Sequence, residues 1–368
     1  MSGSGWRGLF SHDGPRSRGL AALLLAIAAG LALAPFVFPG SRALAAAAQM
    51  LVFIVLVASY DLLLGYTGIV SFAHTMFYGI GAYGVAIACT RLGPGWGSVG
   101  LGLALALALS LVLSLLIGLF SLRVRAIFFA MITLAVASAF QTLASQLSDL
   151  TGGEDGLSLH VPAVLSPSFQ LLSQPLLGLR VDGRVVAYYG LLAVSLACFL
   201  LLLRIVNSPF GRVLQAVREN DFRAEALGYR TVVYRTAASV ISALFATVAG
   251  ALLALWLRYT GPDTTLSFEV MLDVLLIVVI GGMGTMYGAV VGTVLFVLAQ
   301  NYLQDLLKGL GGEGGWLHGV PVLGALTSPG RWLLWLGLLF VLAVYRVPAG
   351  VVGQLRLRAP RTPRRPPR

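Results

Sequence analysis

Long runs of apolar residues constrain this chain more than any other feature of its sequence. A helix needs about 17 to 25 apolar residues to cross a bilayer. Hydrophobic residues make up 58% of the 368 residues and charged residues only 11%, so the chain cannot cover a water-facing surface. We therefore predict an all-α integral membrane protein, a polytopic bundle of about ten transmembrane helices, with glycines interrupting the pair at 268–304. The expected spans are 20–38, 43–64, 68–89, 99–122, 126–148, 186–204, 234–257, 268–283, 286–304 and 331–346.

The basic residues lie at the ends of these apolar segments, where they act as topology signals rather than as a nucleic-acid surface. If the N-terminus is placed in the cytoplasm, all but seven of the 25 Lys and Arg residues fall on the cytoplasmic side. This bias predicts that both termini are cytoplasmic. The seven residues expected outside are Arg42, Arg91, Arg180, Arg184, Arg258, Lys308 and Arg331.

The topology also predicts how the chain is divided. Arg16 and Arg18 before the first apolar run, and ALAAAA at 43–48, resemble a cleaved signal peptide. That run is longer than a usual signal-peptide core, which favours a retained helix. Glycine and proline clusters predict irregular backbone in the outer loops. The expected parts are a cytoplasmic leader (1–19), a transmembrane domain (20–346) with a cytoplasmic loop (205–233) and periplasmic loops (149–185 and 305–330), and a basic, Pro/Arg-rich cytoplasmic tail (347–368).

The cytoplasmic loop contains an unusual concentration of charge. In VRENDFRAEALGYR (217–230), six of the fourteen residues are charged: Arg218, Glu219, Asp221, Arg223, Glu225 and Arg230. The pattern from Arg212 to Leu227 predicts one amphipathic helix, which Gly228 is placed to end. Its apolar face is expected to hold Val213, Ala216, Val217 and Ala224. A helix resting on lipid headgroups is usually richer in Lys and Arg alone, so the mixed charges favour a surface that docks another protein.

Two glycine-rich stretches interrupt the apolar runs. In GYTGIVSFAHTMFYGIGAYG (65–84), Gly65 and Gly68 frame a tight turn, and Ser71, His74 and Thr75 bring polar groups into an apolar segment. Broken helices of this kind either pack closely or line a transport path. In GGMGTMYGAVVG (281–292), Gly281 and Gly282 mark a break between two spans. Gly284, Gly288 and Gly292 recur every four residues and predict a tight helix-packing face.

Acidic residues in or near the spans are few. Glu269 and Asp273 lie four residues apart near the outer end of their span, where an entrance or an interface is expected rather than a proton relay. Asp61, one turn before Gly65, is expected at the inner boundary of its span.

The sequence gives little support to catalysis. The four histidines are scattered and show no metal-binding spacing, and the only lysine, Lys308, is not part of a phosphate-binding loop. Cys89 and Cys198 lie in apolar runs and are expected to be small buried hydrophobes. We expect no catalytic residues, no metal site and no cofactor bound by this chain. Any ATP that the system uses would be bound by another chain.

Four blocks in order resemble one family, the membrane subunits of branched-chain amino-acid ABC importers (LivM-type permeases). They are DLLLGYTGIVSFAHTMFYGIGAYG, FFAMITLA followed by LTGGEDGLS, SPFGRVLQAVRENDFRAEALGYR, and GGMGTMYGAVVG. The resemblance covers roughly residues 50–300. It implies a permease without catalysis of its own in the bacterial inner membrane. Its expected partners are a second, homologous permease subunit, two cytoplasmic ATPases that use ATP and Mg²⁺, and a periplasmic substrate-binding protein.

The resemblance also implies roles for particular residues. Glu225, Ala226, Leu227 and Gly228 match the family's coupling element, so the ATPases are expected to act on Arg218–Gly228. We expect the binding protein to dock on the outer loops, including Thr151, Gly152, Gly153, Glu154, Asp155 and Gly156. The polar end of the substrate is expected to meet Tyr66, Ser71, His74, Thr75 and Thr133.

Other functions remain open at this point. Urea, short amides and aromatic acids use similar permeases. An ion-coupled secondary transporter is an alternative from a different class, but it would need charges buried at mid-membrane, and this sequence offers few. A membrane-embedded enzyme is disfavoured because no metal motif is present.

Overall fold

We describe the chain from a computed structural model that covers residues 18–37, 40–121, 126–166, 169, 182–311, 331–347 and 349–357. Most of the predicted leader, residues 312–330 of the outer loop, residues 358–368 of the tail and parts of the loop 149–185 lie outside the described residues.

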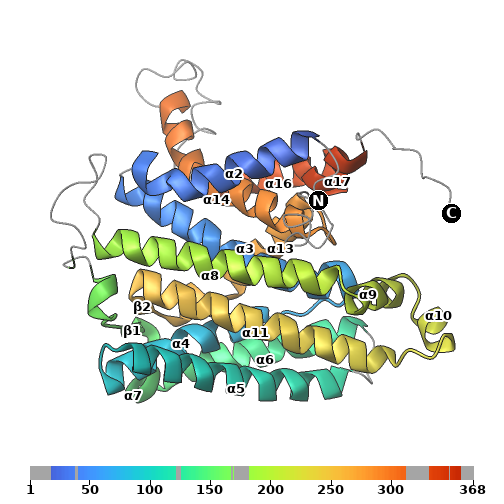
Figure 1. Ribbon diagram of the computed structural model, residues 1–368, viewed down its shortest axis with the longest axis horizontal. Helices are drawn as coiled ribbons and strands as arrows, with labels where there is room; N and C mark the ends of the chain where they lie inside the picture. Colours follow the sequence, from blue (N-terminus) through green and yellow to red (C-terminus); the bar gives the residue numbers. More distant parts are fainter. Residues whose placement is uncertain are drawn as a thin grey trace, which may run out of the picture.

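The described chain is an all-α bundle (Figure 1). Nine of its helical segments are long and apolar enough to cross a membrane. Helix α4, with 19 residues, lies outside those nine but matches the span expected at 68–89. The helices that correspond to the ten expected spans are α2 (Arg18–Val37), α3 (Ser41–Thr67), α4 (His74–Leu92), α5 (Trp96–Ser121), α6 (Ala126–Gln146), α8 (Gly183–Val206), α11 (Thr231–Leu257), α13 (Phe268–Gly281, with α12, Pro262–Thr265, before it), α14 (Met286–Gly311) and α16 (Trp332–Arg346).

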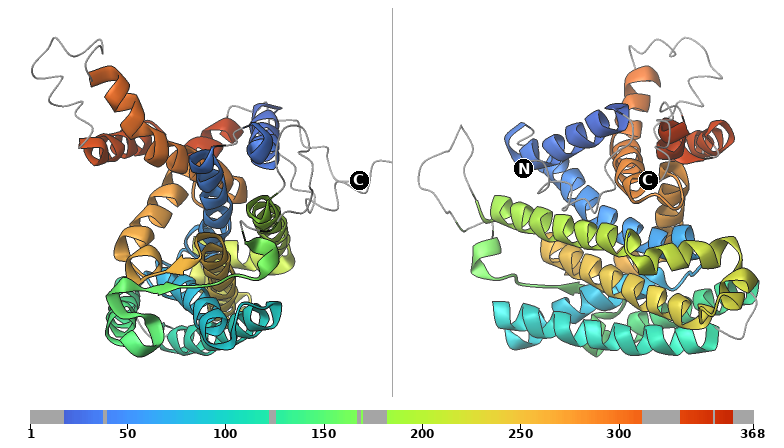
Figure 2. Two further views of the ribbon diagram at one scale, coloured as in Figure 1. Left: turned by 90° about the vertical axis from the view of Figure 1, so that its left-hand side faces the viewer. Right: turned by 45° about the vertical axis from the view of Figure 1, so that its right-hand side comes forward.

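Short elements mark the two ends of the bundle. Helices α9 (Pro209–Glu219), α10 (Asp221–Ala226) and α17 (Gly350–Leu357) lie at one end, which we call the α9 end. Helix α7 (Ser148–Thr151), the turns η1 (Gly153–Asp155) and η2 (Ala163–Leu165), and strands β1 (Leu157–Ser158) and β2 (Tyr259–Thr260) lie at the opposite end, the strand end. The strand end faces the reader in the left view of Figure 2.

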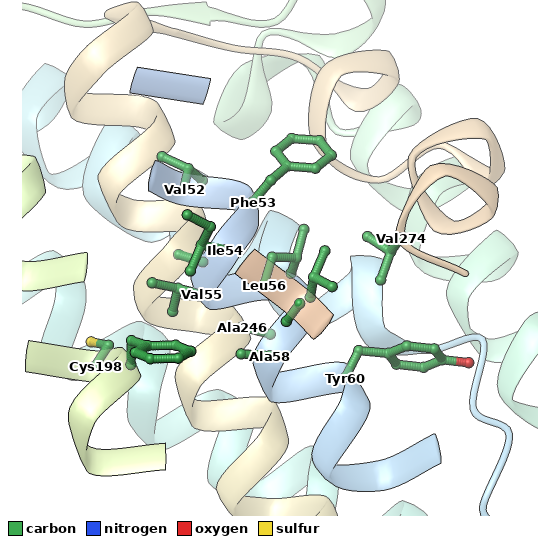
Figure 3. Packing of buried hydrophobic residues seen from close by; sticks show 14 of the residues in the cluster. Val52, Phe53, Ile54, Val55, Leu56, Ala58, Tyr60, Cys198, Ala246 and Val274 are labelled. Carbon is green, nitrogen blue, oxygen red and sulfur yellow. The ribbon is translucent and has the colours of Figure 1, made fainter. Parts of the chain in front are cut away.

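Helix α3 forms the centre of the core. Nearly all of its side chains from Leu44 onward are buried, whereas α5 and α6 bury only about a fifth of their membrane-length windows. Figure 3 shows α3 residues from Val52 to Tyr60 beside Cys198 of α8, Ala246 of α11 and Val274 of α13. Both cysteines are free and buried, which confirms their prediction as small core residues.

Glycines allow α4 to approach its neighbours at backbone distance. Gly81 lies against the carbonyl of Thr247 on α11, and Gly250 of α11 lies against the carbonyl of Tyr78 on α4. Gly84 packs against Gly102 and Ala106 of α5 in the same way. Small residues have this effect between membrane helices because they remove the side chains that would hold the backbones apart.

Three features of the chain path differ from the sequence expectation. Helix α4 begins at His74 rather than at residue 68, which leaves Gly68–Ala73 non-helical. The loop 149–185, expected to be irregular, holds short helical turns and a strand, β1, that pairs antiparallel with β2. Helix α14 begins at Met286, so only Gly288 and Gly292 lie on its packing face, against Gly281 and the carbonyl of Ile277. Gly284 precedes the helix with a φ of 77°, which removes it from the predicted packing face.

Candidate functional site

The break between α3 and α4 is the most irregular part of the bundle interior. Helix α3 ends at Thr67, and Gly68 adopts a left-handed conformation with a φ of 73°. The N–H groups of Gly68 and Ile69 donate to the carbonyl of Leu63, which closes the end of the helix. Glycine suits this position because a left-handed φ costs it no steric strain. The chain then continues without helical structure to Ala73.

The non-helical segment runs back along α3 into the bundle. At its far end, Nε2 of His74 lies 3.0 Å from Oγ of Ser59 and 3.2 Å from the carbonyl oxygen of Leu56. These two residues precede Thr67 by 8 and 11 positions, which corresponds to about 12–17 Å along a helix at 1.5 Å per residue. Helix α4 therefore starts well inside the bundle, and Gly68–Ala73 carries non-helical backbone across that depth.

Helix α6 holds this segment in place through Thr133. The N–H of Phe72 donates to Oγ1 of Thr133 at 3.0 Å, and the Thr133 hydroxyl donates to the carbonyl of Ala130 at 2.9 Å. The Phe72 ring lies 5.9 Å from the ring of Phe268 at the start of α13. Ile69, Val70 and Phe72 are only half-buried. Non-helical backbone at membrane depth is tolerated where protein buries it or where it lines a water-filled path, and the half-buried residues of this segment fit the second case.

The five residues predicted to meet a substrate do not form one cluster. All of them are buried, and Ser71 and Thr133 belong to the segment and to its support on α6. His74 contacts Ser59 and Leu56 of α3, and its ring lies 5.1 Å from that of Tyr60. Tyr66 and Thr75 lie on α3 and α4. A cavity of about 550 Å³ lies elsewhere, between α2, α3, α8 and α14, and its mostly apolar lining includes none of the five residues.

The two carboxylates predicted near the outer end of a span lie on α13. Glu269 is exposed and Asp273 is half-buried. They share their exposed side with Leu272 and lie next to Phe268. Charged groups inside a span avoid hydrocarbon, so this side of α13, close to the Gly68–Ala73 segment, is a face for water or protein rather than for lipid.

The charged loop predicted to be cytoplasmic (205–233) forms two helices instead of the single one expected from Arg212 to Leu227. Asn220 ends α9 with an extended conformation (φ −160°, ψ 103°), and its side-chain oxygen accepts a hydrogen bond from the N–H of Arg223 at 2.9 Å. Asparagine in this position caps the N-terminus of a new helix, here α10. The expected apolar face is also partly wrong, because Ala216 is exposed and Leu214 is buried. Gly228 follows α10 with a φ of 90°.

Two of the acidic side chains in this loop are held by the start of α11. Asp221 pairs with Arg235 at 2.9 Å, and the hydroxyl of Thr231 donates to Glu225 at 2.7 Å. These contacts fix α10 against α11 rather than leaving both carboxylates free for a partner. All of the predicted coupling residues except Asp221 are exposed: Arg218, Glu219, Arg223, Glu225, Ala226, Leu227 and Gly228, and so is Arg230.

The most exposed large apolar side chain of this loop was not predicted as a site residue. Phe222 is 86% exposed, and Leu227 nearby is 72% exposed. Aromatic side chains are frequent anchors of protein interfaces, so Phe222 is a candidate contact residue. The only signal in the sequence is that Phe222 stands alone among charged residues.

The turn Thr151–Gly156, at the strand end of the bundle, is compact. The Thr151 hydroxyl donates to the carbonyls of Ala144 and Leu147, at 2.5 and 2.7 Å, and the Tyr259 hydroxyl donates to the carbonyl of Asp155 at 3.0 Å. Gly152, Gly153 and Gly156 all have φ values in the left-handed region, between 66° and 77°. Of the six predicted docking residues, Glu154 and Asp155 are exposed and the rest form the scaffold beneath them.

The role of Thr133 can be tested by replacing it with valine, which has the same shape but no acceptor for the Phe72 N–H. Loss of a hydrogen bond costs about 1 kcal/mol at a part-buried site such as this one, so Gly68–Ala73 should loosen while α6 stays folded. We expect faster hydrogen–deuterium exchange at Phe72 and Ala73. Thr142→Val is the matched control, since Thr142 bonds only the Ser138 carbonyl of its own helix at an exposed site. Equal exchange in both variants would contradict the supporting role of Thr133.

No group of three His, Cys, Asp or Glu side chains that could hold a metal ion occurs within the described ranges.

Comparison with known proteins relates the chain to transport permeases. It is 29% identical over 272 residues to the Salmonella typhimurium protein named "High-affinity branched-chain amino acid transport system permease protein LivM", which covers 70% of this chain and 63% of that protein. The Escherichia coli protein of the same name is 28% identical over 268 residues, covering 69% of this chain and 62% of that protein.

A more distant relative is the "Probable branched-chain amino acid transport permease protein LivM" of Methanocaldococcus jannaschii, 24% identical over 222 residues, or 60% of this chain and 58% of that protein. The aligned regions thus span less than two thirds of the length of these relatives. No solved structure matches the chain. The family described as "Branched-chain amino acid transport system / permease component" matches residues 42–344. With nine helices in its described part that are long and apolar enough to cross a membrane, the chain is a multi-pass membrane protein that belongs to this family of transport permeases.

Proposed function

We propose that the chain is a membrane-spanning permease subunit of an ATP-driven ABC importer, and that it forms part of the pathway for leucine, isoleucine, valine or related small amino acids and amides. The observation that carries this proposal is the non-helical segment Gly68–Ala73. It crosses part of the bundle interior with three half-buried apolar residues and one supporting hydroxyl. Broken membrane helices place free backbone groups where a polar substrate can bind them.

The chemistry of this segment suits an amino acid with an aliphatic side chain. Ile69, Val70 and Phe72 offer apolar contacts to the side chain. The backbone groups of the segment, with the hydroxyls of Ser71 and Thr133, offer hydrogen bonds to the ammonium and carboxylate groups. The exposed face of α13 with Phe268, Glu269 and Asp273 would form the opposite wall, or would meet the second permease subunit.

The partners follow from the two ends of the bundle. The α9 end would be cytoplasmic, and two ATPases that bind ATP and Mg²⁺ would dock on α10 around Phe222 and Leu227. The strand end would be periplasmic and would receive a substrate-binding protein at Glu154 and Asp155. This orientation places both termini in the cytoplasm and the complex in the bacterial inner membrane. Alternating access would follow if ATP binding favours one of two bundle states.

Reconstitution into liposomes tests this proposal. The chain would be combined with its cognate second permease, the ATPases and the binding protein, and uptake of radiolabelled leucine would be measured with and without internal ATP. We expect leucine uptake that requires ATP and the binding protein. Urea and benzoate are the comparison substrates, and a preference for either would reject the branched-chain assignment. Leucine uptake by the chain alone, driven by an ion gradient, would contradict the proposal that it is a subunit of an ABC importer.

A further inference from the structure

A buried polar cluster joins four segments at the α9 end of the bundle. Its centre is Asp61 of α3, which is 1% exposed. Oδ1 of Asp61 accepts a hydrogen bond of 2.8 Å from the N–H of Gly284, in the break between α13 and α14. A carboxylate buried this deeply is costly unless hydrogen bonds and an opposite charge compensate it. The hydrogen bond to Gly284 supplies only part of that compensation.

Arg218 of α9 supplies the opposite charge. Its side chain passes over Gly68, where a Cβ would lie 3.2 Å from the Arg218 Cγ. Arg218 is exposed overall, but its guanidinium group donates to the carbonyl of Gly65, the residue that packs against Oδ1 of Asp61. The positive charge therefore lies at the edge of the bundle, near the buried carboxylate, although the two described side chains do not form an ion pair.

The glycines around this cluster are explained by the same contacts. A Cβ on Gly65 would lie 2.0 Å from Oδ1 of Asp61 and 2.3 Å from the nitrogen of Gly284. A Cβ on Gly284 would lie 3.0 Å from the Arg218 guanidinium, and the φ of Gly284 is 77°. The turn after α3 and the break before α14 therefore both leave room for Arg218 and Asp61.

One oxygen of the cluster has no partner. Oδ2 of Asp61 is buried without a hydrogen bond, although most buried polar atoms in proteins are paired. Arg218 meanwhile uses the Gly65 carbonyl, a weaker acceptor than a carboxylate. A small movement of α9 would let the guanidinium pass from that carbonyl to Oδ2 without leaving the cluster.

We propose that Arg218 and Asp61 form a transmission pair, in which displacement of α9 and α10 moves the end of α3 and the α13–α14 break together. This inference rests on the proposed function, because it assigns the route from the docking loop into the bundle. Arg218 is a positioning residue here, since it acts on the pathway through Asp61, Gly65 and Gly284. The Gly68–Ala73 segment begins at the same cluster, so Gly68 and its neighbours would move with the pair.

The test compares Arg218→Gln, Asp61→Asn and Arg218→Lys in the reconstituted complex. Both ATP hydrolysis and leucine uptake are measured, and the readout is the uptake per ATP hydrolysed. Hydrogen bonds to charged groups shift an equilibrium by about tenfold or more, so we expect Arg218→Gln and Asp61→Asn to lower this ratio by about that factor while hydrolysis continues. Arg218→Lys keeps the charge and should recover part of the ratio. Arg212→Gln, an exposed α9 arginine outside the cluster, is the matched control.

A second measurement tests the connection between α9 and the α13–α14 break without a transport assay. Nitroxide labels are placed at Gln215 on α9 and Met283 in the α13–α14 break, both exposed, after Cys89 and Cys198 are replaced by alanine. We expect a narrow distance distribution that broadens in Asp61→Asn and Arg218→Gln but not in Arg212→Gln.

The two measurements separate the possible failures. An unchanged distribution in Asp61→Asn and Arg218→Gln overturns the pair as a link. If the distance distribution broadens but the uptake per ATP stays normal, the pair only stabilises the structure, and its proposed role in transmission is overturned. Absence of ATP-driven uptake in the unmodified complex instead rejects the proposed function, and the label distances still report whether the link exists.

Discussion

Replacing Gly81 with alanine is expected to destabilise the bundle strongly. A Cβ at this position would lie 1.8 Å from the carbonyl oxygen of Thr247 and 2.7 Å from its carbonyl carbon. The obstacle is backbone, which cannot rotate away as a side chain can, so α4 and α11 must separate. Overpacking of a filled core costs about 1–3 kcal/mol and occasionally more, and we expect a value near 3 kcal/mol or above.

The separation of α4 from α11 would also open the reciprocal contact. Gly250 of α11 meets the carbonyl of Tyr78 at the same 1.8 Å, so one added methyl group disturbs two glycine contacts. Loss of van der Waals packing matters here because close contact, rather than exclusion of water, holds membrane helices together.

Gly190→Ala is the matched control for Gly81→Ala. Gly190 lies within α8, and a Cβ there meets no atom within 4 Å. Alanine is the better helix former by about 1 kcal/mol, so this variant should be neutral or slightly more stable. The measurement is the thermal unfolding midpoint of both variants in detergent, with the monodisperse fraction by size-exclusion chromatography. Equal midpoints for the two variants would show that α4 and α11 do not pack as described.

The helices themselves could be predicted from the apolar runs, since each expected span corresponds to a helix of the bundle. Where α4 begins could not. Gly65 and Gly68 predict a turn, but the depth at which the helix resumes depends on contacts between distant residues, His74 with Ser59 and Phe72 with Thr133. The helix propensities of individual residues give no information about such contacts between distant residues.

The small sheet shows the same limit at shorter range. Leu157 pairs with Thr260, and Ser158 with Tyr259. Two-residue strands have no alternating pattern that a sequence could reveal, and their partners are separated by α8, α9, α10 and α11.

For the charged loop, the composition predicted a docking surface but not its geometry. Asn220 divides the expected helix because its side chain caps α10, a local competition that a helical pattern does not show. Asp221 and Glu225 are occupied by Arg235 and Thr231, and Arg218 points into the bundle toward Gly65. Three of the six charges that drew attention to the loop therefore help to fix its shape, and the exposed apolar side chains Phe222 and Leu227 become candidates for the proposed contact.

Replacing Phe222 with aspartate is the second change with a large expected effect, here on assembly rather than on stability. Phe222 is 86% exposed at the tip of α10, so its loss should leave the unfolding midpoint unchanged. If the ring anchors a partner ATPase, its removal should cost at least about 2 kcal/mol of binding free energy, as for other interface hot spots. That corresponds to an affinity roughly 30-fold weaker.

The measurement is ATPase binding to the chain, assembled with its second permease in lipid nanodiscs, by surface plasmon resonance. Phe222→Leu is the control, because it keeps an apolar side chain at the same position and should retain most of the affinity. A lower unfolding midpoint in Phe222→Asp would mean that the ring packs within the loop. Unchanged ATPase binding together with a normal midpoint would place Phe222 outside the interface, as expected if α10 rests on lipid headgroups. Weaker binding with a normal midpoint is the result that identifies Phe222 as the anchor, because only a side chain held by the partner combines full exposure in the free chain with a large loss on truncation.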